Sequence, residues 1–240
     1  MHKRIGILGG MSPESTVAYY EYITRTYTER HGDYSYPEVL IYSVSFQPYV
    51  DWPNAGRWDL VAEGLAEAAQ RLVAAGAEVL LIATNTMHIV FPQVQAPVDV
   101  PMISLLDAVA AAIRAAGIDT VGLLGTRFTM EQPFYRQALA DHGIEVLVPG
   151  AEDRAMVNRV IYDELVAGQI RPESRAAFLA VIGRLAERGA RGIILGCTEI
   201  PLLVHQADAD GYGVQLFDTT TIHAEAALNY AIRESSPGRG

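Results

Sequence analysis

The sequence contains one cysteine, no long apolar run and no basic stretch, and each of these scarcities excludes a class of protein. A single cysteine among 240 residues cannot form an intramolecular disulfide, which favours a reducing, cytoplasmic compartment. No segment approaches the ~18 consecutive apolar residues of a membrane-spanning helix, and the start is too short for a signal peptide. A net charge of −10 without a basic cluster argues against nucleic-acid binding. We therefore expect a cytoplasmic protein with no membrane or nucleic-acid partner.

What the sequence does contain is a regular alternation of strand-like and helix-like segments. Half of its residues are apolar and 19% are charged, as in a globular protein with a substantial core. Short apolar runs such as residues 4–8 indicate buried parallel strands, and each is followed by a helical pattern. The alternation predicts an α/β protein with parallel sheets flanked by helices. Residues 46–57, rich in proline and aromatic residues, are predicted to form a loop, of which residues 49–57 could act as a lid.

An internal repeat predicts two similar lobes. Residues 71–84 align without a gap on residues 184–197, and residues 5–10 resemble residues 121–126 at nearly the same offset. We expect the lobes to be related by a pseudo-two-fold axis, with the active site in the cleft between them. Since the second copy is complete near residue 205, the first lobe is expected to comprise residues 1–104 and 206–240. The second lobe is then residues 105–205.

The repeat places two reactive side chains at equivalent strand ends, Thr84 in the first copy and Cys197 in the second. Ligands of parallel sheets bind at the carboxyl ends of strands, where Gly10 and Thr126 also fall. Cys197 precedes a helical pattern, so we expect the helix dipole to lower its pKa from ~8.5 toward neutrality. Two acid/base groups on opposite sides of a carbon can invert a stereocentre without a metal or pyridoxal cofactor. We predict that Thr84 and Cys197 flank one small substrate.

Residues next to these strand ends are candidates for holding the substrate. The predicted substrate-binding residues are Met11, Ser12, Asn85, Thr86, Thr126, Thr198 and Glu199. Glu199 and His223 could orient or tune Cys197, and His88 could assist Thr84 from one helical turn further on. The nearest cations for a second carboxylate are Arg57 and Arg127. Each of these residues also has an ordinary interpretation as a helix cap, a core residue or a surface charge.

Four motifs in order resemble the aspartate/glutamate racemases. They are residues 9–16, 85–88, 124–131 and 196–201, and residues 217–219 with His223 extend the match almost to the end. The resemblance implies a cofactor-independent two-base racemase of aspartate or glutamate, built as two α/β lobes and assembled as a homodimer. It implies no cofactor and no metal.

Thr84 departs from the pattern of this family, because most members have cysteine in the corresponding Cys-Asn-Thr motif. A threonine hydroxyl is a far weaker acid than a thiol, so Thr84 cannot readily become a base, although it can pass a proton to a strongly basic carbanion. The resemblance assigns the second-half cysteine to the L face. We therefore predict an unequal pair that prefers L-amino acids.

Three other functions fit parts of the sequence. A nucleotide-binding enzyme could use residues 6–10, although the third glycine of the dinucleotide motif is missing. A decarboxylase or hydantoin racemase of the same fold would need only one good acid, which Cys197 supplies. A non-catalytic amino-acid-binding protein would explain the threonine at position 84 as lost activity.

Overall fold

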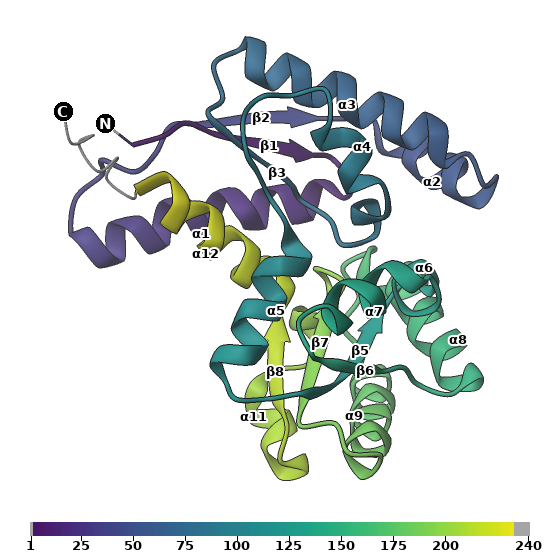
Figure 1. Cartoon of the computed structure of the whole chain (residues 1–240). Coiled ribbons are helices and arrows are strands. Elements are labelled where there is room, and N and C mark those ends of the chain that lie inside the picture. The colour runs from purple at the N-terminus through teal and green to yellow at the C-terminus, as the bar shows by residue number, and fades with distance from the viewer. Residues whose placement is uncertain (1, 233–240) are drawn as a thin grey trace. The chain divides into compact units, whose positions relative to one another are not determined.

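The computed structural model describes residues 2–232 and divides into two compact α/β units (Figure 1). The first unit comprises the chain as far as Leu105 and again from His223, and the second comprises Leu106–Ile222. Each unit is built on a four-stranded sheet in which every pairing is parallel. The predicted α/β class with two similar parallel sheets flanked by helices is confirmed.

The first sheet has the strand order β2-β1-β3-β4 and is covered by helices on both faces. Its strands are β1 (Ile5–Gly9), β2 (Val39–Ser43), β3 (Val79–Ile82) and β4 (Met102–Ile103). On one face pack α1 (Pro13–His31) and the C-terminal part of α12 (Thr219–Ile232), which lie side by side in Figure 1. The other face packs against α2 (Phe46–Asn54), α3 (Trp58–Ala74), the 3-10 helix η1 (Thr86–Val90) and α4 (Phe91–Gln95). Since successive side chains of a strand point to opposite faces, β1 and β3 contribute to both cores.

The second sheet has the equivalent order β6-β5-β7-β8. Its strands are β5 (Thr120–Gly125), β6 (Glu145–Leu147), β7 (Gly192–Gly196) and β8 (Gln215–Asp218). The longer helices of this unit are α5 (Leu105–Ala115), α7 (Pro133–Ala140), α8 (Ala151–Val160) and α9 (Pro172–Glu187). Shorter segments are α6 (Arg127–Glu131), the π-helix η2 (Ile161–Leu165), α10 (Ile200–Leu203), α11 (Gln206–Ala209) and the 3-10 helix η3 (Asp210–Tyr212).

Strand register shows the same internal repeat as the sequence. Ile5 lies beside Val79 in the first sheet, and Val121 lies beside Gly192 in the second. These are the pairs that the sequence alignment of the two copies makes equivalent. Consequently β1 and β5 are counterparts, and so are β3 and β7. Thr84 and Cys197 follow equivalent central strands.

Two predictions about the path of the chain are wrong. The C-terminal strand belongs to the second unit, because β8 pairs with β7 and completes a sheet equivalent to that of β4 with β3. The chain returns to the first unit only from His223, so the expected boundary near residue 205 is too early. Residues 46–54 form the helix α2 rather than a loop. Pro48 is tolerated there because it lies in the first turn, where backbone N–H groups have no helical partner.

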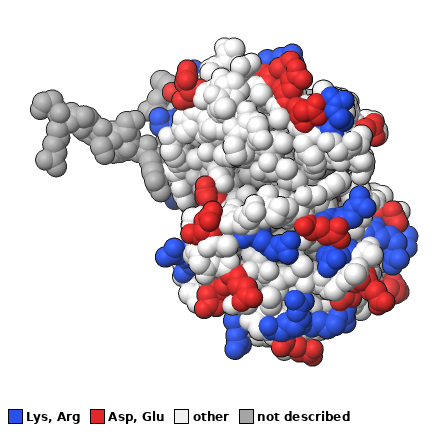
Figure 2. Space-filling model, turned by 45° about the vertical axis from the view of Figure 1, so that its right-hand side comes forward, with Lys and Arg blue, Asp and Glu red and all other residues white. Residues whose placement is uncertain are grey.

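Acidic and basic side chains are interspersed over the face drawn in Figure 2, where basic groups lie next to acidic ones rather than in a continuous stripe. Among residues 2–232, no helix combines the length and the apolar character needed to cross a bilayer.

Candidate active site

The turn from β1 into α1 is built by two glycines and a helix cap. Gly10 has φ of +90° and donates its N–H to Thr16 Oγ1 at 2.8 Å, while a Cβ atom on Gly9 would collide with the Thr16 side chain. Ser12 caps α1, accepting from Ser15 N at 3.3 Å. These contacts explain the glycines by close packing within the turn, without any nucleotide. They also leave Met11 and Ser12 buried at the carboxyl edge of the first sheet.

Thr84 follows β3 at the same edge and is half-buried. Its N–H donates to Ile82 O at 2.8 Å, which turns the chain into η1 and leaves Asn85 buried behind it. His88 lies one turn further on and contacts the main chain of Thr84. Leu105 N donates to His88 Nε2 at 3.1 Å, so the ring proton lies on Nδ1 and is donated to Thr84 O at 2.8 Å. His88 is thus a neutral histidine that holds the backbone of Thr84, as a supporting residue would.

His223 is buried in the first unit and uses both ring nitrogens there. Its Nε2–H donates to Ile103 O at 2.8 Å, and Nδ1 accepts from the hydroxyl of Tyr19 at 2.8 Å. Its ring packs edge-on against that of His88, with 5.7 Å between centroids. Burial is the main reason that the pKa of His223 is lowered from 6.5 to about 3. These partners tie His223 to the His88 side of the site, whereas the sequence-based interpretation considered it for Cys197.

The low pKa of His223 predicts that acid destabilises the protein. Below pH 6.5 the unfolded chain gains a proton at this position while the folded chain does not, so stability falls until the pH approaches 3. The expected slope from this group is about 1.4 kcal/mol per pH unit. Denaturant unfolding of wild type and His223→Gln at pH 7, 6 and 5 should show a smaller pH dependence in the variant. The exposed His31, changed to glutamine, serves as the control and should keep the wild-type slope; equal slopes in all three proteins would contradict the assignment.

In the second unit, the turn from β5 into α6 repeats the design of the first. Thr126 caps α6, accepting from Thr129 N at 3.3 Å, and the two hydroxyls lie 3.2 Å apart. The corresponding hydroxyls of Ser12 and Ser15 lie 3.3 Å apart. The cap of α6 is therefore Thr126. Thr126 is buried at the carboxyl edge of β5.

Cys197 follows β7, and its thiol is hydrogen-bonded to a carboxylate. Sγ donates to Glu199 Oε2 at 2.9 Å, and the Thr198 hydroxyl donates to the same oxygen at 2.8 Å. Glu199 itself is buried. Burial, together with the negative charge of Glu199 and this hydrogen bond, raises the pKa of Cys197 well above its usual value.

The prediction of a lowered pKa for Cys197 is therefore wrong. The helix that follows is only the four-residue α10, which begins three residues after the cysteine. Its dipole is small, and a buried carboxylate in direct contact outweighs it. In the resting protein Cys197 is a thiol, and Glu199 is the group that could accept its proton.

Sequence reasoning missed Tyr162 and Asp218. Tyr162 lies on the π-helix η2, and η2 contacts α10 just after Glu199. Burial raises the pKa of Tyr162, the neighbouring Cys197 and Glu199 raise it further, and Arg127 lowers it. Asp218 ends β8 beside Leu195 of β7, and burial raises the pKa of its carboxyl group. No periodicity reveals a π-helix, although π-helices are enriched at functional sites.

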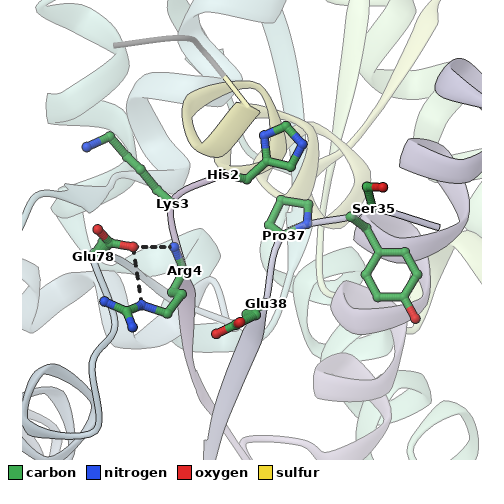
Figure 3. Close-up of a pocket in the computed structure, with 8 residues that line it drawn as sticks. His2, Lys3, Arg4, Ser35, Pro37, Glu38 and Glu78 are labelled. Carbon is green, nitrogen blue, oxygen red and sulfur yellow. Dashed lines mark hydrogen bonds and ion pairs between the residues drawn. The ribbon is translucent and has the colours of Figure 1, made fainter. Parts of the chain in front are cut away.

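A surface depression of about 480 Å³ lies at the other end of the first sheet, away from Thr84. Figure 3 shows its lining from the segments that enter β1, β2 and β3, with Glu78 accepting from Arg4 N at 2.9 Å and paired with the Arg4 guanidinium at 3.2 Å. Its charges are mixed and partly neutralised. Catalytic groups of parallel sheets gather at the carboxyl edge, so this depression is not the candidate active site. Among residues 2–232, no three histidine, cysteine, aspartate or glutamate side chains are grouped as metal ligands would be.

Comparison with known proteins places this arrangement in a family. Residues 8–227 match the Asp/Glu/Hydantoin racemase family. The broad specificity amino-acid racemase RacX of Bacillus subtilis (strain 168) is 24% identical over 94% of this chain and 96% of its own length. The structure of a candidate Asp/Glu racemase from Yersinia pestis is 46% identical, with a TM-score of 0.90 over 96% of this chain and 100% of that one. An aspartate racemase homologue from Pyrococcus horikoshii OT3 is 39% identical, with a TM-score of 0.83 over 97% of this chain and 100% of that one. With the family match covering nearly the whole described fold, the chain belongs to the Asp/Glu/Hydantoin racemase family.

Proposed function

We propose that the protein racemises aspartate or glutamate without a cofactor, using Cys197 and Thr84 as an unequal acid/base pair. The observation that carries the proposal is their equivalence: each follows the matching central strand of a duplicated sheet, at the edge where substrates bind. Family membership supports racemase activity. We infer that one substrate contacts both residues, with Asn85, Thr86 and Thr198 beside its α-carboxylate.

Glu199 gives Cys197 a way to become a base. On substrate binding the thiol passes its proton to the Glu199 carboxylate along the 2.9 Å hydrogen bond. The thiolate then removes the α-proton of the L-enantiomer and becomes a thiol again. The carbanion takes a proton from the Thr84 hydroxyl on its other face, which yields the D-enantiomer. Solvent returns the proton from Glu199 to Thr84, so the cycle ends in its starting state. A thiolate with a raised pKa is a stronger base, which suits a weakly acidic C–H bond.

The equilibrium constant of racemisation limits which rate constants can differ between the two enantiomers. Because enantiomers have equal free energy in water, kcat/KM is the same in the two directions, and a preference for L-amino acids cannot appear there. It appears in hydrogen exchange instead. Cys197 can remove and return a proton on the L face many times before Thr84 protonates the other face.

We therefore expect the α-proton of L-glutamate or L-aspartate to exchange in heavy water faster than the amino acid racemises. The D-enantiomer is expected to exchange no faster than it racemises, because its proton must be removed at Thr84. Proton NMR of the α-position together with chiral chromatography of the same samples measures both rates. Faster exchange of the D-enantiomer would refute the assignment of Cys197 to the L face.

The same measurements separate the other functions considered. If α-proton exchange occurred only with other amino acids, the protein would be a racemase of different specificity. One relative, RacX, is named a broad specificity amino-acid racemase. Release of carbon dioxide from a malonate would indicate a decarboxylase, and loss of optical activity from a hydantoin would indicate a hydantoin racemase. Binding of glutamate without exchange would indicate a binding protein. A homodimer in the cytoplasm remains part of the proposal.

A further inference from the structure

Arg127 is a cation at the carboxyl edge of the second sheet whose charge is not paired with any carboxylate among residues 2–232. Some arginines elsewhere in the same unit are paired with carboxylates, such as Arg154 with Glu131, Arg175 with Asp208 and Arg184 with Asp153. Arg57, the other cation that the sequence suggested, forms a two-pronged ion pair with Asp59. Its charge is therefore already compensated. Arg127 is the better candidate to meet a carboxylate of the substrate.

Strand register places the segment that leads to Arg127 beside the segment that carries the cysteine. Gly125 lies beside Gly196 in the ladder of β5 and β7, so Thr126 and Cys197 leave neighbouring strands at the same level. Neighbouring strands are roughly 5 Å apart. Arg127 follows Thr126 as the first residue of α6. Both residues belong to the second unit, so this proximity is fixed by one sheet.

Two contacts hold Arg127 in place. Its backbone N–H donates to Asn158 Oδ1 at 2.7 Å, which ties it to α8 one turn before Tyr162. Its guanidinium lies over the ring of Phe128, with 5.4 Å between Cζ and the ring centroid. Arg127, Cys197 and Glu199 all influence the pKa of Tyr162. Together with the pairing of β5 and β7 and the contact with Asn158, this puts the segment that carries the cation beside the segment that carries the thiol and its carboxylate.

The chemistry of a dicarboxylic substrate requires such a cation. Aspartate and glutamate bring a second carboxylate next to the buried Glu199, and the thiolate form of Cys197 would add more negative charge. Like charges at this range in a partly dry site repel strongly. A guanidinium offsets the repulsion and matches a carboxylate with two parallel hydrogen bonds. A neutral side chain would gain nothing from it.

We propose that Arg127 binds the distal carboxylate of the substrate and makes the site selective for dicarboxylic amino acids. The role assigned to Arg127 rests on the proposed racemase function. This role identifies the residue that recognises dicarboxylic substrates at that site.

The test compares L-glutamate with L-glutamine, which differ in the charge at the distal position. For Arg127→Gln we expect KM for glutamate in α-proton exchange to rise about 10- to 100-fold, the range of a lost hydrogen bond between charged groups. The KM for glutamine should change less than threefold. Arg127→Lys should restore part of the glutamate affinity. The matched control is Arg159→Gln, which removes an exposed arginine from α8 and should leave both substrates unaffected.

Calorimetric titration of glutamate into the same proteins separates this proposal from the reaction itself. If glutamate binding depends on Arg127 but no α-proton exchange occurs, the racemase proposal is refuted and the role of Arg127 in binding the distal carboxylate is supported. If the wild type exchanges the α-proton with equal KM for glutamate and glutamine, the proposed role of Arg127 is refuted, but the proposed racemase activity is not. The role of Arg127 would also be overturned if Arg127→Gln lowered the affinity for glutamate and glutamine equally, or lowered neither.

Discussion

Replacing Cys197 by serine is expected to abolish α-proton exchange of both enantiomers, lowering the rate on the order of 10³-fold or more. Serine keeps the shape of the side chain and can still donate to Glu199. Its hydroxyl, however, is too weak an acid to give up a proton to a carboxylate. With Thr84 on the other side, the variant would contain two hydroxyls and no group able to become a base.

Two controls keep the Cys197 experiment interpretable. Thermal unfolding should show that Cys197→Ser is folded, since the residue lies at the margin of the core and is only partly buried. Calorimetry should show that glutamate still binds, because the proposed carboxylate contacts are intact. Exchange that persists above about a hundredth of the wild-type rate would remove Cys197 from the mechanism.

Replacing Thr84 by cysteine is expected to raise exchange of the D-enantiomer on the order of 100-fold, since a thiol can become a base where a hydroxyl cannot. Racemisation in both directions should rise with it, because protonation at this face limits the wild-type reaction. Exchange of the L-enantiomer at Cys197 should change little. The unequal pair would become an equal one.

The matched control is Thr84→Val, which removes the hydroxyl and keeps the branched shape. Racemisation should fall on the order of 100-fold in this variant, while exchange of the L-enantiomer continues at Cys197. The two rates, measured on the same samples by NMR and chiral chromatography, would then be uncoupled. If the valine variant racemises as fast as wild type, Thr84 is not the second acid.

The fold could be predicted because its signals are local and repeated. Buried parallel strands are apolar along their whole length, as in β3 and β7, and such runs are visible without knowing their neighbours. The repeat between residues 71–84 and residues 184–197 fixed the equivalence of Thr84 and Cys197 before any coordinates. Ser12 was recognisable as a cap because the residues that follow it are suited to the start of a helix.

What could not be predicted depends on tertiary contacts. Helix α2 contains Pro48 and Pro53, and local rules favour a loop for such a segment, but Tyr49 packs its ring into the core and stabilises the helix. Strand β8 belongs to the second sheet because it pairs with β7, and nothing in its own four residues indicates this pairing. For Cys197 the sequence offered a helix start and a nearby glutamate with opposite effects on the pKa. Only the 2.9 Å contact and the burial show which effect wins.

The second unit is one continuous segment inserted into the first, and this has a consequence for biosynthesis. Every residue of the inserted segment leaves the ribosome before residues 223–232, so the first unit lacks Ala224, Ala227, Leu228 and Ala231 of its core until the whole inserted segment has been made. The part of the chain made first therefore completes its folding last. The first sheet, with Thr84 at its edge, therefore lacks part of its helical cover until after the half with the cysteine has been made.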